Sequence, residues 1–260
     1  MTPYQTKQLK SNELIDRLNV CTTSHFLDEM ELRRIQQQAA KLTEQGGAFA
    51  ASGYFLLGAI SAIRVNKAEV DRCFKAALML SDADNYPVYK LNYVIASQRT
   101  YGIRQAADLC QELATSYPDD IGILKQAIDC ADAACRFELG KSLRVRLTAL
   151  DVDHEDDSTR NVGPMLSRMT DFGLSEDDLL ARIEVAGGLL LDKGFRYMGT
   201  ELFIDDSGES LYSFKLIINS STAADLNFEI AEELVGRFSD PMENVLSICV
   251  VPYSKRGAVE

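Results

Sequence analysis

The chain lacks tryptophan and has only two histidines and six prolines among its 260 residues. Its most continuous apolar stretch, residues 55–63, is much shorter than the about 20 residues that a membrane helix needs. Lys7 and Lys10 are not followed by an apolar run, so the start of the chain does not have the pattern of a secretory signal. We therefore expect no association with a membrane.

The six cysteines form no Cys-x-x-Cys pair. Cys73 stands beside Phe74 in an apolar pattern, and such cysteines are typically small buried hydrophobic residues in a reducing compartment, here expected to be the cytoplasm. A zinc site needs closely spaced cysteine or histidine ligands, and the only histidines are His25 and His154. We expect neither a metal nor another cofactor.

Catalytic motifs are also missing. There is no Gly-x-Ser-x-Gly elbow and no phosphate-binding Walker loop. One alternative, a nuclease core like that of restriction endonucleases, requires an acid-x-Lys triplet to hold Mg²⁺. The chain has Ser213, Phe214 and Lys215 at that place, without the carboxylate. We expect a protein with no enzymatic activity and no catalytic residues.

The charge is distributed unevenly along the chain. Residues 1–150 have a net charge of +1, whereas residues 151–260 have a net charge of −13. An acidic half of this kind repels phosphate backbones, so direct binding of nucleic acid is not expected. The charge favours a basic partner, or else an acidic surface that only keeps the protein in solution.

Two helical pairs in the first half repeat at an offset of 36 residues. Aligning residues 53–82 with residues 89–118 superposes Val70 on Ala106 and Phe74 on Cys110. Repeats of this length are typical of stacked helical hairpins, because one hairpin cannot bury its apolar face without a neighbour. The sequence therefore predicts a helical-hairpin array over residues 1–150, with an ordinary helical bundle as the alternative.

Residues 50–150 resemble the tetratricopeptide (TPR) repeat family. The first copy carries the family's aromatic, Leu, Gly and small-residue spacing at Tyr54, Leu57, Gly58, Val70, Phe74 and Ala77. The second copy keeps Tyr93, Ala106 and Pro118 but departs from the pattern at Lys90 and Val94, and residues 121–150 form a weaker third copy. The resemblance implies a superhelix that binds proteins or peptides.

The resemblance also implies that the first helix of each pair faces the binding groove. The positions this marks are Phe55, Ala59 and Ile63, then Leu91, Ile95 and Arg99, then Lys125, Asp129 and Asp132. The apolar members are equally compatible with plain core packing. Arg99, Lys125, Asp129 and Asp132 are therefore the candidate partner-binding residues, because burial of a charged side chain is unfavourable.

Residues 151–174 are rich in acids and contain Gly163 and Pro164, so they are interpreted as an acidic linker. Beyond them, residues 175–260 read as a small acidic domain of order α-β-β-α-β, with a hairpin over residues 195–218 and a last strand over residues 245–251. A right-handed crossover lays the last strand parallel to the second. The expected fold class is α+β, with the all-α repeat array first.

Two functions of different kinds fit these features. The first is a non-catalytic intracellular adaptor or chaperone-like protein whose TPR-like groove holds a protein or peptide. The alternative is an inhibitor or immunity-type protein whose acidic C-terminal domain neutralises a basic enzyme. The sequence names neither the partner nor the oligomeric state.

Overall fold

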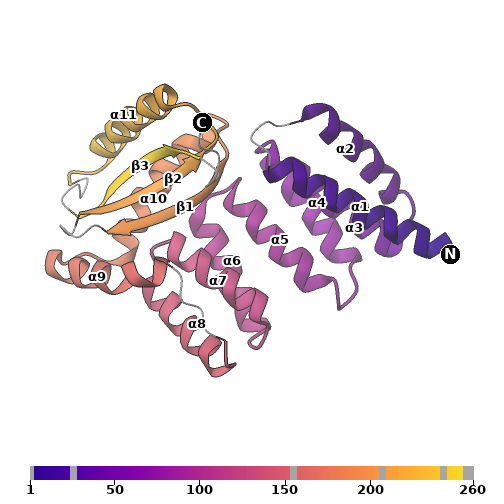
Figure 1. Cartoon of the computed structure of the whole chain (residues 1–260), viewed down its shortest axis with the longest axis horizontal. Helices are drawn as coiled ribbons and strands as arrows, with labels where there is room; N and C mark the ends of the chain where they lie inside the picture. The colour runs from indigo at the N-terminus through magenta and orange to yellow at the C-terminus, as the bar shows by residue number, and fades with distance from the viewer. Residues whose placement is uncertain (1–2, 24–27, 153–156, 205–208, 241–244, 254–260) are drawn as a thin grey trace. The chain divides into compact units, whose positions relative to one another are not determined.

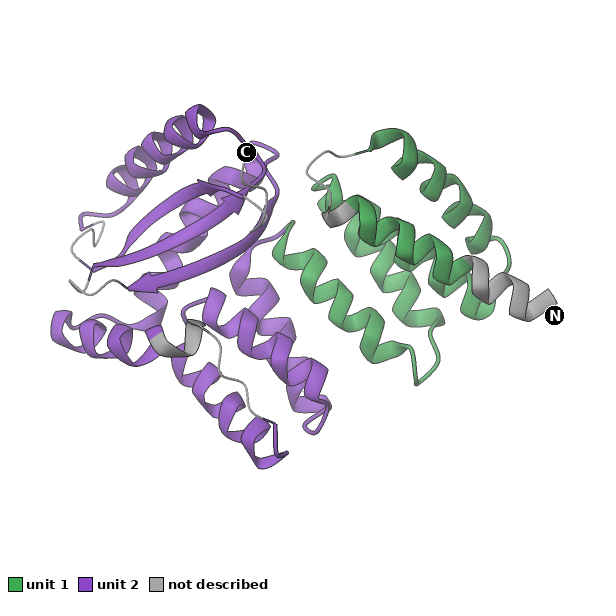
Figure 2. Ribbon diagram, in the orientation of Figure 1, with its two compact units in different colours: residues 1–100 green, residues 101–260 purple. Residues whose placement is uncertain are grey.

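The computed structural model of the chain describes residues 3–23, 28–152, 157–204, 209–240 and 245–253. It divides into two compact units, residues 1–100 and residues 101–260, which Figure 2 shows in green and purple. Counted over these ranges, unit 1 has a net charge of +2 and unit 2 a net charge of −14. The acidity of the chain thus belongs to unit 2.

The described residues of unit 1 form five helices (Figure 1). They are α1 (Pro3–Thr23), α2 (Glu29–Thr43), α3 (Gly47–Ile63), α4 (Lys67–Leu80) and α5 (Tyr86–Gln98). Local sequence sets their ends: the side chain of Asp28 accepts a hydrogen bond from the Glu31 amide at the start of α2, and Asn66 does the same for Glu69 at the start of α4. Gly46 precedes α3 with a φ of 76°, which favours glycine.

Close helix contacts in unit 1 depend on two glycines of α3. A Cβ atom added at Gly53 would lie 2.7 Å from the carbonyl oxygen of Ala39 in α2. A Cβ atom added at Gly58 would lie 2.7 Å from the ring of Phe74 in α4. Helix α3 is therefore held tightly between α2 and α4, and this fixes the face that it presents on the side of α1 and α5.

Unit 2 begins with five more helices. They are α6 (Ile103–Ser116), α7 (Ile121–Ala133), α8 (Phe137–Ala149), α9 (Asp157–Phe172) and α10 (Glu176–Asp192). The second helices of the three predicted hairpins begin at Lys67, Ile103 and Phe137, so successive copies are offset by 36 and then by 34 residues. The predicted succession of helical hairpins is therefore present, although the division between the units falls between α5 and α6.

A three-stranded sheet completes unit 2, in the order β1 (Tyr197–Ile204), β2 (Ser210–Leu216), β3 (Ser247–Pro252), with α11 (Ser220–Arg237) between the last two strands in sequence. Strands β1 and β2 are antiparallel, and β2 and β3 are parallel. The predicted α+β class, the α-β-β-α-β order and the parallel last strand are confirmed. Residues 205–208 of the predicted hairpin, which fall in its expected turn over residues 205–209, lie outside the described residues.

The core of unit 2 lies on one face of this sheet. Tyr212, Phe214 and Leu216 of β2 are buried, and α10 approaches so closely that a Cβ atom added at Gly187 would lie 3.4 Å from the Phe214 ring. The hydroxyl of Tyr212 donates a 2.6 Å hydrogen bond to the carbonyl of Ala133 at the end of α7. Helices from before the predicted linker are thus packed into the same unit as the sheet.

The predicted linker differs from the structure, because residues 157–172 form helix α9. Met165 and Met169, one turn apart, are buried, and Asn161 donates a 2.9 Å hydrogen bond to the carbonyl of Leu202 in β1. Burial against the sheet outweighs the helix-breaking tendency of Pro164, whose missing N–H leaves one backbone carbonyl of the preceding turn without its helical donor.

Candidate functional site

Three helices of unit 1, α1, α3 and α5, surround a groove. A cavity of about 330 Å³ lies among α1, α3, α5 and the turn that precedes α5. Ile15 and Asn19 line it from α1, Phe49 and Phe55 from α3, and Tyr89 from α5. The groove is therefore built from segments far apart in sequence but within one compact unit.

Aromatic rings form the floor of the groove. The rings of Phe55 and Tyr89 are stacked, with centroids 5.0 Å apart, and Phe55 also meets Phe74 edge-on at 6.0 Å. Phe74 in turn stacks on Tyr93 at 5.4 Å, and the Tyr93 hydroxyl donates a 2.7 Å hydrogen bond to Asp71. Such pairs add about 0.5–1.5 kcal/mol each beyond their buried area, so they help to hold Phe55 and Tyr89 in place.

The rim of the groove is polar and almost uncharged. Its side-chain amides come from Asn12 and Asn19 on α1, Asn85 before α5 and Asn92 on α5. Among the described residues that line the groove, the one carboxylate is that of Asp82, which accepts hydrogen bonds from the backbone N–H and the side chain of Asn85 at 2.9 and 2.8 Å. None of these described residues is a lysine or an arginine.

Tyr89 contributes no charge to the groove at neutral pH. Burial raises the pKa of its phenol, and a 3.1 Å hydrogen bond to the hydroxyl of Ser52 acts in the opposite direction. The ring therefore presents an apolar face, and its hydroxyl is held near Ser52 on α3.

None of the four candidate partner-binding residues from the sequence lines this groove. Arg99 is half-buried at the C-terminal end of α5 in unit 1. Lys125, Asp129 and Asp132 lie on α7 in unit 2, where Lys125 is half-buried and Asp129 is exposed. A role of these residues in binding stays a prediction.

Asp132 is in a different environment from the other three. It is 8% exposed, and its carboxylate pairs with the guanidinium of Arg144 on α8, with one of the two contacts at 3.2 Å. A Cβ atom added at Gly140 would lie 2.8 Å from the Asp132 carboxylate, so the glycine leaves room for the pair. The pair thus joins α7 to α8, which is a structural role.

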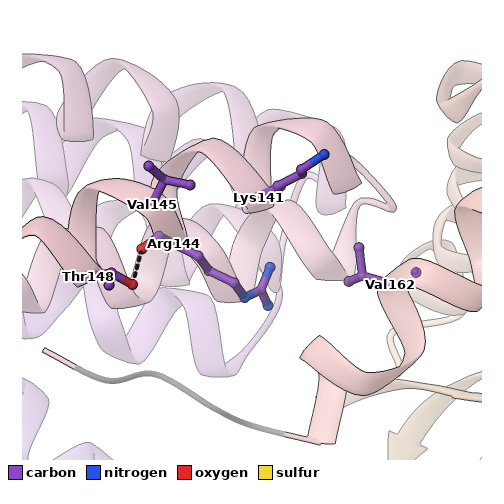
Figure 3. A pocket seen from close by; sticks show the side chains of 6 residues that line it. Lys141, Arg144, Val145, Thr148 and Val162 are labelled. Carbon is purple, nitrogen blue, oxygen red and sulfur yellow. Dashed lines mark hydrogen bonds between the residues drawn. The ribbon is translucent and has the colours of Figure 1, made fainter.

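A second cavity, of about 360 Å³, lies between α8 and α9 in unit 2 (Figure 3). Lys141, Val145 and Thr148 of α8 face Val162 of α9 there. Arg144 also borders it, but its guanidinium is engaged by Asp132. The cavity therefore has mainly apolar walls and offers no convergent set of polar groups.

Sequence reasoning identified Phe55 of the groove but missed its amide rim. A signal was present, because Asn12 and Asn19 are seven residues apart, as are Asn85 and Asn92. Seven residues are nearly two helical turns, so each pair points to one side of its helix. Tertiary packing brings α1 and α5 to the same groove beside α3, and neither helix's own sequence indicates this.

The described part of the chain holds no group of three or more His, Cys, Asp or Glu side chains able to bind a metal ion, and His25 and His154 lie outside it. None of its helices is long and apolar enough to span a membrane. The six cysteines are free thiols, and all but Cys249 are buried.

No protein-family model, no curated protein and no solved structure matches this chain.

Proposed function

We propose that the chain is a non-catalytic protein-binding adaptor or chaperone-like protein, acting in the cytoplasm, whose unit 1 holds an extended peptide segment in the groove of α1, α3 and α5. The observation that carries the proposal is the combination of an aromatic floor with a rim of asparagine amides in one cavity. The resemblance to TPR repeats points in the same direction and is part of the proposal.

The rim suits a polypeptide backbone. An asparagine amide has two N–H donors and one acceptor oxygen, which match the N–H and C=O groups that an extended chain presents at every residue. Asn85 and Asn92 each use one N–H in a 2.8 Å hydrogen bond, to Asp82 and to the carbonyl of Val88, and each keeps a second N–H and the amide oxygen. Asn12 and Asn19 stand on α1, on the other side of α3 from Asn92 on α5, so an extended segment can be held from two sides. Because the amides bind the backbone of the peptide, the groove can accept peptides of different sequence.

The floor selects an apolar side chain. The cavity of about 330 Å³ is at the small end of the range of about 300–1,000 Å³ for ligand sites, which fits one or two side chains and not a large cofactor. Phe55 and Tyr89 provide the stacked surface on which such a side chain packs.

The charge of the lining selects against anions. None of the described lining residues is a lysine or an arginine, so these residues offer a terminal carboxylate or a phosphate no ion-pair partner. The carboxylate of Asp82 favours a lysine or arginine of the peptide beside the apolar anchor. The preferred segment is therefore internal, with one apolar residue near one basic residue.

The test is selection from a displayed library of random peptides against the full chain, followed by fluorescence-anisotropy titration of the selected peptides. We use Ala48→Trp to fill the groove, since Ala48 lines it and is the second residue of α3. The matched control is Ala68→Trp, because Ala68 is likewise exposed and second in α4 but does not line the groove.

We expect selected peptides to carry an apolar and a basic residue, to bind the wild type and Ala68→Trp equally, and to bind Ala48→Trp at least about tenfold more weakly. The proposal fails if no peptide is enriched, or if both variants bind the selected peptides as the wild type does.

A further inference from the structure

Helix α11 carries an exposed apolar stripe that no described part of unit 2 covers. The α11 stripe consists of Ala224, Phe228, Ala231 and Val235, all exposed. Phe228 and Val235 are each 66% exposed. The spacing of four, three and four residues places the side chains in one row, the pattern by which one helix packs along another.

The opposite side of α11 fixes the helix to the sheet. Its buried residues are Ala223, Leu226, Ile230 and Leu234. Between these and the α11 stripe, the amide of Asn227 accepts a 2.5 Å hydrogen bond from the N–H of Val250 and donates a 3.1 Å bond to its carbonyl. Helix α11 therefore lies along the free edge of β3.

The α11 stripe borders the face of the sheet that α10 does not cover. Lys193, which ends α10, forms a 2.6 Å ion pair with Glu229 of α11, so α10 lies on the Glu229 side of the helix. Successive residues of a helix are about 100° apart around its axis. On α11, the centre of the α11 stripe therefore lies about 70° around the axis from Asn227, in the direction that leads away from Glu229. That side adjoins the second face of the sheet.

We name this second face of the sheet the open face. Directly paired residues of neighbouring strands point to the same side of a sheet, so the register gives the rows of residues across the open face. They are Phe203, Leu211 and Ser247, then Glu201, Ser213 and Cys249, then Gly199, Lys215 and Val251. Phe203 is 54% exposed, and Figure 1 shows the strands from the side opposite to α10.

The open face carries no unpaired charge, because Glu201 and Lys215 form a 2.8 Å ion pair across it. Small residues occupy its centre, where Ser213 and Cys249 are paired. Ser213 is 4% exposed, so its hydroxyl lies beneath the neighbouring side chains. The open face is thus a mixed and nearly neutral surface beside the α11 stripe, and its apolar members are Phe203, Leu211, Cys249 and Val251.

Backbone groups on both edges of the sheet are engaged by side chains, which disfavours the addition of a strand. Asn161 of α9 bonds the outward carbonyl of Leu202 on β1, and Asn227 occupies both backbone groups of Val250 on β3. Both edges are therefore engaged by side-chain amides, which leaves the open face as the surface for docking.

The dimensions of the open face fit one helix. Three strands about 4.8 Å apart and six residues long, at about 3.3 Å each, present roughly 300 Å². A stable dimer needs about 800 Å² per partner, so the open face is too small to hold two copies together. A single helix about 10 Å wide and four turns long covers it while contacting the α11 stripe.

The charge identifies the kind of helix. Asp225 and Glu232, both exposed and neither paired with a described cation, border the α11 stripe, and unit 2 has a net charge of −14. A second copy of α11 would bring the same acids against each other, which is repulsive. A helix with lysines or arginines beside its apolar row is complementary.

We propose that the α11 stripe and the open face together bind one amphipathic α-helix of a partner protein, with apolar residues at four- and three-residue spacing flanked by lysines or arginines. This surface belongs to unit 2 and does not depend on the groove in unit 1.

The test uses two designed helical peptides of about 18 residues with the same leucine row, one flanked by lysines and one by glutamates. Each is titrated by fluorescence anisotropy against the full chain and against Val235→Glu. The matched control is Val20→Glu on α1, because Val20 is 68% exposed and receives the same change of residue and charge. Circular dichroism checks that each variant is folded.

We expect saturable binding of the lysine peptide only, weakened at least about tenfold by Val235→Glu and unchanged by Val20→Glu. The double variant Asp225→Lys with Glu232→Lys should reverse the preference toward the glutamate peptide. The proposal is overturned if the lysine peptide does not bind up to about 1 mM, or if both valine variants weaken it equally. It is also overturned if the wild-type chain alone forms dimers that Val235→Glu abolishes, or binds phosphatidylserine vesicles through the α11 stripe.

Discussion

Replacing Gly53 of α3 by alanine should destabilise unit 1, although alanine favours helices. The added Cβ atom would lie 2.7 Å from the carbonyl oxygen of Ala39, 2.8 Å from the backbone N of Thr43 and 2.9 Å from its Cγ2. Two of these are backbone atoms of α2, so the clash is relieved only if α2 and α3 separate. The groove depends on the position of α3.

The expected magnitude follows from two opposing effects. Overpacking of a tight contact costs about 1–3 kcal/mol, and replacing glycine by alanine inside a helix gains up to about 1 kcal/mol. Because two of the three contacts are with backbone atoms, the overpacking cost lies in the upper half of its range, and the net loss for Gly53→Ala is about 1–2 kcal/mol. Gly188→Ala in α10 is the matched control, because nothing lies within 4 Å of its added Cβ atom, and it should gain about 0.5–1 kcal/mol.

Hydrogen exchange measured by mass spectrometry reports the stability of each segment separately. The effect of Gly53→Ala is therefore measured in α2 and α3, and the effect of Gly188→Ala is measured in α10. We expect exchange in α2 and α3 to become about five- to thirtyfold faster in Gly53→Ala and exchange in α10 to slow in Gly188→Ala. Unchanged or slower exchange of α2 and α3 in Gly53→Ala would refute the close packing of these helices.

Three further changes test other parts of the structure. Arg144→Met leaves Asp132 buried without its partner and should cost about 3 kcal/mol in urea unfolding, and Asp132→Leu added to it should recover most of that loss. Asn227→Ala uncovers the edge of β3, so light scattering should show faster aggregation on heating. Hydrogen bonds from the side chain and backbone N–H of Ser175 lower the pKa of Asp178. The ionised carboxylate therefore stabilises the fold above the unfolded-state pKa of about 3.8, and this contribution is lost as pH falls through the lower folded-state pKa. Ser175→Ala should raise the Asp178 pKa in an NMR titration and make the acid-induced loss smaller.

Elements with local signals could be predicted from the sequence. Ser175 and Asp178 form a capping box at the start of α10, and Asn66 caps α4; such residues before a helical stretch are a local signal. Alternate residues of β2, such as Tyr212 and Phe214, are buried in the core, which is the two-residue period of a strand. These features depend on residues close in the chain, which is why the α-β-β-α-β order could be read.

Features that depend on distant contacts could not be read. Residues 157–172 look like a linker because of the neighbouring acids, Gly163 and Pro164, yet burial of Met165 and Met169 against the sheet makes them a helix. The repeat positions make Asp132 a candidate for binding, and no local pattern indicates that Gly140 leaves room for its ion pair with Arg144 of α8. In both cases a tertiary contact overrides the local pattern.

The candidate site shows the same limit. Phe55 was marked by its place in the repeat, whereas Asn12, Asn19 and Asn92 acquire a shared role only when α1 and α5 come to flank α3. The unit boundary at residue 100 likewise depends on packing, because α6 and α7 belong with the sheet through contacts such as the 2.8 Å ion pair of Arg104 with Glu184.

The measurement that tests the central claim most directly is hydrogen exchange of the full chain with and without a saturating library-selected peptide. Binding in the groove predicts slower exchange in α1, α3 and α5, which supply its lining, and unchanged exchange in the sheet of unit 2. Protection confined to unit 2, or none at saturation, would contradict the assignment of peptide binding to the groove of unit 1.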